Sequence, residues 1–238
     1  MNTSSEPALF VGLLQNRQYP LQKDYFTSLN SFFQNYQQDH YIVIESTDLL
    51  NTGEYAIYHG STKDNETIIG ELESIMNRYS KLKQISDYTF TQIEYYSQAV
   101  NIDVKKITHI LINEINAQKL INIGKDLLQF RKRGFLLIGL GNLTQKEGTG
   151  NLEPTEEVKE FDAWLRIKLW EFDYYSIRDI DTYFPIQRNL YQEKVELYAP
   201  FLVIFGSLEG TDIIYDIFTG FEGNNSLRSF YFSPNVIN

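Results

Sequence analysis

The chain has 238 residues, a length that one α/β domain can fill, and we expect residues 1–238 to form a single domain. Hydrophobic residues make up 42% and charged residues 22% of the sequence, which argues against a disordered chain, and no apolar run approaches the roughly 20 residues that span a bilayer. The absence of cysteine excludes disulfides, thiolate metal sites and a cysteine nucleophile, and the net charge of -10 opposes binding to nucleic acid or to anionic membranes.

The first half of the chain alternates between expected strands and helices. The apolar run of residues 8–14 predicts a buried strand, the amphipathic residues 25–36 predict a helix, and residues 41–44 predict a second buried strand. No basic stretch precedes the first apolar run, so we expect a strand rather than a signal peptide and a cytoplasmic protein. Helical spacing is shown by Ile68, Leu72, Ile75 and Met76. Residues 107–115 are rich in β-branched side chains and predict another strand.

The second half continues with a clear helix and strand. Four apolar residues share one face of a helix over residues 117–133, namely Leu120, Ile123, Leu127 and Phe130, and Gly134 ends it before an apolar strand at residues 135–140. A polar loop at residues 145–154 precedes a helix at 155–170, whose first turn is acidic. Residues 195–207 fit either a helix or a strand, and 212–218 and 226–232 are strand candidates. This order predicts an α/β fold with a mixed central sheet and helices on both faces.

Three features bear on possible partners. The only dense basic run is Arg131, Lys132 and Arg133, which we interpret as cations opposing a helix C-terminal dipole rather than as a nucleic-acid site. Gly139-Leu140-Gly141 lacks the third glycine of a dinucleotide fingerprint, so we expect no nucleotide site. The paired tyrosines at 95–96 and 174–175 are compatible with a pocket lining or with the interface of a homo-oligomer, and the sequence leaves this open.

The sequence contains only three histidines. His109 falls inside an expected strand, where a packed or hydrogen-bonded side chain is typical, while His40 and His59 lie in polar surroundings that favour solvent exposure. We therefore do not expect the three to converge on one metal ion.

Several segments resemble the DOPA-type extradiol ring-cleavage dioxygenases of the LigB-like superfamily. The stretch GKDLLQFRKRGFLLIGLGN at residues 124–142 is similar to the family's helix, glycine and strand. The segments EFDAWLRIKL, ELYAPFLVIFGS and SLRSFYF at residues 160–169, 196–207 and 226–232 resemble later family motifs, and PALFVGLL at residues 7–14 resembles its opening strand. The order agrees over most of the chain, except at about 47–100. The resemblance implies a LigB-like fold, in a family that uses Fe²⁺ or Zn²⁺.

The resemblance also places the family's functional histidines on residues of other types. Its first metal position falls at Leu13, the second at Thr47 or Asp48, the third at Gln145, and the acid/base position at Leu197. Leucine offers no lone pair to a metal, and a site made only of oxygen donors would favour Mg²⁺ or Ca²⁺ over redox iron. We therefore expect no metal cofactor and no catalytic residue of the family's kind.

Three functional hypotheses remain after the sequence is read. The favoured one is a pseudoenzyme of this family that keeps the scaffold and acts as a binding or partner protein, with a small aromatic molecule as a possible ligand. The alternative is an enzyme of altered chemistry, using Asn142 together with Thr47, Asp48 and Gln145 at the strand ends. In the third, His59 moves into the former site and restores partial metal binding.

Overall fold

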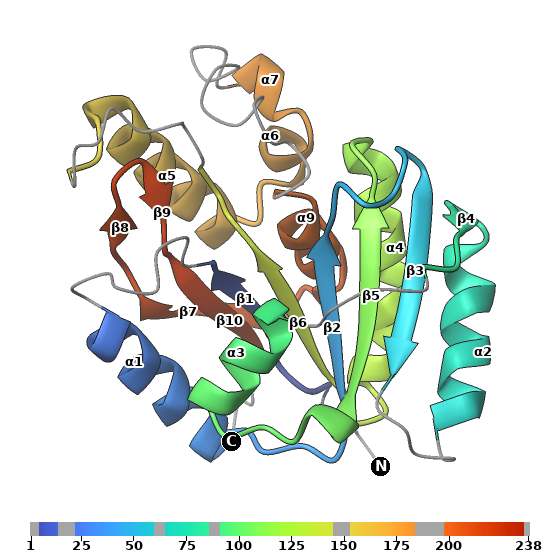
Figure 1. Cartoon of the computed structure of the whole chain (residues 1–238). Coiled ribbons are helices and arrows are strands. Elements are labelled where there is room, and N and C mark those ends of the chain that lie inside the picture. The colour runs from blue at the N-terminus through green and yellow to red at the C-terminus, as the bar shows by residue number, and fades with distance from the viewer. Residues whose placement is uncertain are drawn as a thin grey trace.

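Eight strands form one central sheet in the computed structural model of the chain (Figure 1). The structure describes residues 5–13, 22–59, 65–85, 91–144, 153–183 and 198–235. The strand order is β4-β3-β5-β2-β6-β1-β10-β7, and helices cover both faces. The predicted α/β fold with a mixed sheet is confirmed.

The four central strands are parallel and almost entirely buried. They are β1 (Ala8–Gly12), β2 (Tyr41–Ser46), β5 (Ile107–Asn113) and β6 (Leu136–Gly141). β1, β2 and β6 were expected from apolar runs and β5 from its β-branched residues, which are typical of strands covered on both faces. Because they are parallel, their carboxyl ends meet at one edge of the sheet, which lies at the top of Figure 1.

The outer strands make the sheet mixed. On one side, β3 (Glu54–His59) runs antiparallel to β5, and the short β4 (Lys81–Leu82) is parallel to β3. On the other side, β10 (Ser229–Pro234) runs antiparallel to β1, and β7 (Asp212–Phe218) runs antiparallel to β10. A small ribbon of β8 (Phe221–Glu222) and β9 (Asn225–Ser226) precedes β10. Neither β3 nor β4 was expected from the sequence.

Two apolar clusters separate the helices by face. The first face is covered by α1 (Gln22–Asn35) and α3 (Thr91–Ala99), with the 3-10 turn η1 (Val104–Lys106) after α3. The second face carries α2 (Asn65–Met76), α4 (Ala117–Arg131), α5 (Glu156–Trp170) and α9 (Ala199–Gly206). The short α6 (Tyr174–Arg178) and α7 (Ile180–Tyr183) follow α5. The ambiguous segment at 195–207 thus contains a helix, and none of the helices described is long and apolar enough to cross a membrane.

Helices α4 and α9 pack with their backbones in contact. A Cβ atom built on Gly124 would overlap the carbonyl oxygen of Val203 and stand 2.8 Å from the Cα of Gly206. A Cβ atom built on Gly206 would in turn overlap the carbonyl oxygen of Ile121. The two glycines therefore allow α4 to press the fully buried α9 against the sheet.

The basic run at the end of α4 makes ion pairs. Arg131 lies in the last turn of α4, where a cation was expected, but its side chain is fully buried and forms two hydrogen bonds of 2.9 and 3.0 Å with the carboxylate of Asp212. Burial without a partner would leave an uncompensated charge, and only the fold brings Asp212 to this place. Lys132 pairs with Glu209 at 2.7 Å, and Arg133 pairs with Glu71.

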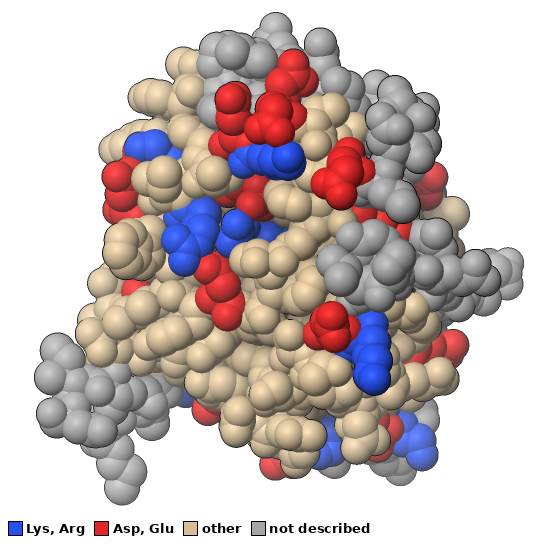
Figure 2. Space-filling view, turned by 90° about the vertical axis from the view of Figure 1, so that its left-hand side faces the viewer, with Lys and Arg blue, Asp and Glu red and all other residues tan. Residues whose placement is uncertain are grey.

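Charges of both signs are interspersed on the side of the molecule shown in Figure 2, where cationic side chains lie beside acidic ones. Among the ion pairs of the described residues, Arg166 Nη2 lies 2.7 Å from Asp216 Oδ2. The same carboxylate receives a hydrogen bond of 2.9 Å from Arg228. Arg166 and Arg228 are therefore paired with an acidic residue of the same chain.

Candidate functional site at the carboxyl edge of the sheet

The residues expected at the site come from the ends of three neighbouring strands. Leu13 follows β1, Asn142 follows β6 and Thr47 follows β2, and the strand order places β6 between the other two. The backbone N–H of Leu13 donates to Gly141 O at 3.0 Å and to Asn142 Oδ1 at 2.8 Å. The structure therefore brings Leu13 and Asn142 into direct contact.

These three residues continue the same face of the sheet. Side chains alternate along a strand, and the residues of β1, β2 and β6 that pack under α1 are Leu9, Val11, Tyr41, Val43, Leu136, Ile138 and Leu140. Continuing this alternation past the end of each strand places Leu13, Thr47 and Asn142 on the same face. With neighbouring strands about 4.8 Å apart, the Cα atoms of Leu13 and Thr47 are separated by about 10 Å, across the intervening Asn142.

The side chain of Leu13 belongs to the core at this edge. It is 7% exposed and lies in the cluster that contains Tyr25 and Leu29 of α1. Thr47 is partly exposed, and its Oγ1 accepts a hydrogen bond of 3.2 Å from the N–H of Leu49. Asp48 is exposed in the turn after β2. Gln145 and Leu197, the other two expected positions, lie outside the described residues.

His59 lies at the opposite edge of the sheet. Its strand β3 is antiparallel to β5, and His59 pairs with Thr108 near the amino end of β5. The N–H of Thr47 donates to Ile112 O, so Thr47 lies beside the carboxyl end of β5. That end is about five residues along β5 from Thr108, or about 17 Å at the rise of a strand. The structure therefore does not bring His59 to the former site.

The other two histidines do not meet His59. His40 is half-buried and stacks on Phe135 with ring centroids 5.3 Å apart, so its expected solvent exposure is wrong, because the ring covers apolar surface at the amino end of β6. His109 is fully buried in β5, as expected, and pairs with Tyr58 across the strands, one residue before His59 and thus on the other face. Among the described residues, no group of three His, Asp or Glu side chains could hold a metal ion.

A network of buried polar groups closes this edge over the ends of β1 and β6. Asn225 Nδ2 donates to Leu13 O at 2.9 Å, and Ser226 N–H donates to Thr144 Oγ1 at 2.9 Å. Thr144 Oγ1 in turn donates to Asn224 O at 2.9 Å. The ribbon β8–β9 is thereby fixed across the strand ends.

Close backbone contact holds β1 under the same ribbon. A Cβ atom on Gly12 would stand 2.7 Å from the carbonyl carbon of Leu227, so this position requires glycine. Gly12 O accepts hydrogen bonds from the hydroxyls of Tyr25 and Tyr96, the second at 3.4 Å. Burial, reinforced by the neighbouring Tyr96, raises the pKa of Tyr25 well above its usual value, which keeps this hydroxyl a neutral donor.

An ion-paired cluster supports the ribbon from the α5 side. Asp162 accepts a hydrogen bond of 2.7 Å from Ser226 Oγ and two of 3.0 Å from Arg228 Nε. Arg228 extends the cluster to Asp216 of β7. Such a bidentate carboxylate pair fixes geometry as well as charge.

Two further polar groups lie near this edge: the side-chain amide of Asn225 and the carboxylate of Glu45. Asn225 is 3% exposed, and its Oδ1 has no hydrogen-bond donor among the described residues. Glu45 lies two residues before Thr47 and faces the same side, and its Oε2 is 3.2 Å from His109 Nε2. Sequence reasoning identified neither Asn225 nor Glu45. The polar triplet at 224–226 was a visible signal, but its partners are far away in the chain.

Comparison with known proteins adds one finding about the fold. The structure is similar to the crystal structure of JW3007, an uncharacterized protein of Escherichia coli K12, with a TM-score of 0.73 over 95% of this chain and 99% of that chain. The two sequences are 15% identical, so the similarity shows a shared fold alone. The chain matches no protein-family model and no curated protein.

Proposed function

We propose that this chain is a pseudoenzyme of the extradiol ring-cleavage dioxygenase family, which keeps the scaffold and acts by binding, without metal and without ring cleavage. The observation that carries this proposal is the burial of Leu13. By resemblance, Leu13 stands where the family's first metal histidine would lie, and its side chain belongs to the core under α1.

The residues at this edge do not fit Fe²⁺ or Zn²⁺. Redox iron and zinc are bound in such sites by neutral imidazoles, with further positions left open for substrate. On the shared face, Leu13 presents only carbon, Thr47 Oγ1 accepts a backbone N–H, and Asn142 Oδ1 accepts the N–H of Leu13. Asp48 is exposed in the turn after β2, beyond the end of the strand.

The polar groups that remain support a binding role. The side-chain amide of Asn225 donates through Nδ2 to Leu13 O, while its buried Oδ1 accepts no hydrogen bond from the described residues. A buried acceptor without a donor costs about 1–3 kcal/mol, and a ligand that supplies an O–H or N–H would recover that free energy. A phenolic hydroxyl on a small aromatic molecule is such a donor.

Metal analysis and a ring-cleavage assay test the proposal. We expect no stoichiometric iron or zinc in the purified chain and no ring-opened product from catechol or DOPA, with or without added Fe²⁺. 4-Nitrocatechol, whose absorption spectrum changes on binding, should bind with the same affinity before and after treatment with EDTA. Stoichiometric iron or zinc, or yellow ring-opened product at enzymatic rates, would refute the proposal.

The pairing of Glu45 with His109 favours a second candidate, an enzyme of altered chemistry on a small aromatic or polar substrate. A carboxylate within 3.2 Å of an imidazole is an arrangement used in acid/base catalysis, and Glu45 lies two residues before Thr47 on the same face of β2. On this view Glu45→Gln would abolish a metal-independent conversion while leaving ligand affinity unchanged. Equal turnover in the wild-type and Glu45→Gln proteins would exclude this role for the pair.

A further inference from the structure

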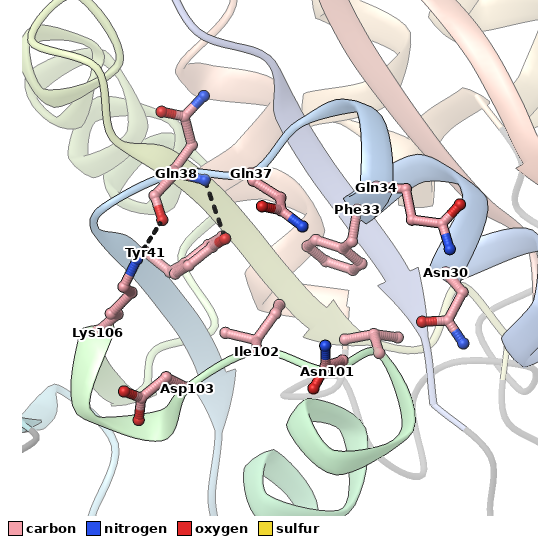
Figure 3. A pocket seen from close by; sticks show the side chains of 11 residues that line it. Asn30, Phe33, Gln34, Gln37, Gln38, Tyr41, Asn101, Ile102, Asp103 and Lys106 are labelled. Atoms are coloured by element: carbon pink, nitrogen blue, oxygen red, sulfur yellow. Dashed lines mark hydrogen bonds between the residues drawn. The ribbon is translucent and has the colours of Figure 1, made fainter.

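A preformed cleft lies at the opposite edge of the sheet, near the amino ends of β2 and β5. Its volume is about 280 Å³, close to the lower limit of roughly 300 Å³ for pockets that bind small molecules (Figure 3). One wall comes from the end of α1 and the residues after it, including Phe33 and Gln37. The other wall comes from the turn after α3, including Asn101 and Ile102.

Hydrogen bonds join the two walls at both ends of the cleft. On the α1 side, Asn30 Nδ2 donates to the carbonyl of Ala99, the last residue of α3, at 2.9 Å. At the other end, Lys106 Nζ donates to Gln38 O at 3.4 Å, and the N–H of Gln38 donates to the hydroxyl oxygen of Tyr41 at 3.0 Å. The cleft therefore exists without a ligand and needs little reorganisation to accept one.

Its lining combines unused amides with apolar surface. None of the hydrogen bonds within the described part of the chain uses the side-chain amide of Gln34, Gln37 or Asn101. These amides come from both walls, and each offers two donor hydrogens and an acceptor oxygen. Between them lie the ring of Phe33 and the side chain of Ile102.

The charges of the cleft oppose binding of a charged ligand. Its two charged residues are Asp103 and Lys106, of opposite sign, and Lys106 is already 3.4 Å from Asp39 Oδ1. The carboxylates of Asp103 and Asp39 repel a phosphorylated ligand, and the ammonium group of Lys106 repels a cationic one.

We propose that this cleft binds a neutral carbohydrate of one or two sugar units. Sugar hydroxyls both donate and accept, as the amides do, and they project around the whole rim of the ring toward both walls. The C–H face of a sugar ring matches the apolar surface of Phe33 and Ile102. A nucleobase places its hydrogen-bonding groups in one plane, which suits amides on two opposed walls less well. This site shares no residue with the proposed function, and either can fail without the other.

NMR titration of the ¹⁵N-labelled chain tests the inference. The probes are methyl β-D-glucopyranoside, cellobiose and maltose, with glucose 6-phosphate and adenine for comparison. We expect saturable shifts for at least one neutral sugar, centred on the backbone amides of Phe33, Asn101 and Ile102, with a dissociation constant of about 1 mM or lower.

Two variants and a control make the test specific. Gln34→Ala and Asn101→Gly should each weaken sugar binding about tenfold or more. Both should fold, because Gln34 is exposed on a helix and glycine tolerates the φ of 56° at Asn101. The control Gln98→Ala, an exposed residue of α3 outside the cleft, should bind as the wild type does. No saturable shift with any neutral sugar, tighter binding of adenine or glucose 6-phosphate, or unchanged affinity in both variants would overturn the proposal.

Discussion

Substitution of Gly124 by alanine tests whether the backbone contact between α4 and α9 organises the core. In an exposed helix the change from glycine to alanine stabilises by about 1 kcal/mol. At Gly124 the added Cβ would overlap Val203 O and lie 2.8 Å from the Cα of Gly206, well inside the roughly 3.5 Å of a normal carbon contact. Since every residue of α9 is buried against the sheet, the helix cannot retreat without disturbing β6, β2 and β1. Overpacking of this kind costs about 1–3 kcal/mol or more.

Gly70→Ala in α2 is the matched control, because a Cβ atom there meets nothing within 4 Å. We expect Gly124→Ala to lower the free energy of unfolding by about 2 kcal/mol and Gly70→Ala to raise it by up to about 1 kcal/mol. For a chain of this size, Gly124→Ala should lower the melting temperature by roughly 4–8 °C. Urea unfolding followed by circular dichroism measures the transition midpoints of both variants, and the dependence of the unfolding free energy on urea concentration should be the same in both. A Gly124→Ala protein as stable as Gly70→Ala would refute the reasoning.

Three further predictions follow from particular contacts. Asp212→Ala leaves the buried guanidinium of Arg131 unpaired and should cost about 3–5 kcal/mol of unfolding free energy in urea titrations; a loss below about 1 kcal/mol would contradict burial of this pair. Burial raises the pKa of Tyr55 to about 12, so the Tyr55 hydroxyl ionises in the unfolded chain before it does in the folded one, and the free energy of unfolding should fall as pH rises from about 10 to 12. The Tyr55→Phe protein should lose less unfolding free energy over that interval. Equal losses in the two proteins would show that Tyr55 is not the cause. The last variant combines Leu13→His, Thr47→His and Gln145→His. If the family's metal site maps onto this edge, zinc should raise the melting temperature of this variant. A folded variant whose melting temperature does not rise with zinc would show that the three positions do not converge.

The sequence by itself identified elements whose environment is uniform along their length. The strands β1, β2, β5 and β6 are covered on both faces, and their sequences are accordingly rich in apolar and β-branched residues. The helix α4 has one buried face and shows the matching spacing, and Gly134, with φ of 92°, follows its end. Local pattern and local environment agree in these segments.

Elements at the margin of the sheet were harder to predict. β3 is buried only at its second and third residues, so its pattern EYAIYH shows neither a continuous apolar run nor strict alternation. α9 is buried all round and its sequence APFLVIFG is apolar throughout, so periodicity could not distinguish helix from strand.

At the carboxyl edge, the sequence determined which residue types are present and therefore that Leu13 offers a metal no ligand atom. Only the tertiary structure decided what surrounds them. Asn225 is 212 residues from Leu13, whose carbonyl it binds, and Asp212 is 81 residues from Arg131, whose charge it neutralises. Propensity and periodicity report interactions within a few residues along the chain. Contacts between distant segments depend on strand order and helix packing, which is why the buried role of Arg131 and the position of His59 at the far edge emerged only from the folded chain.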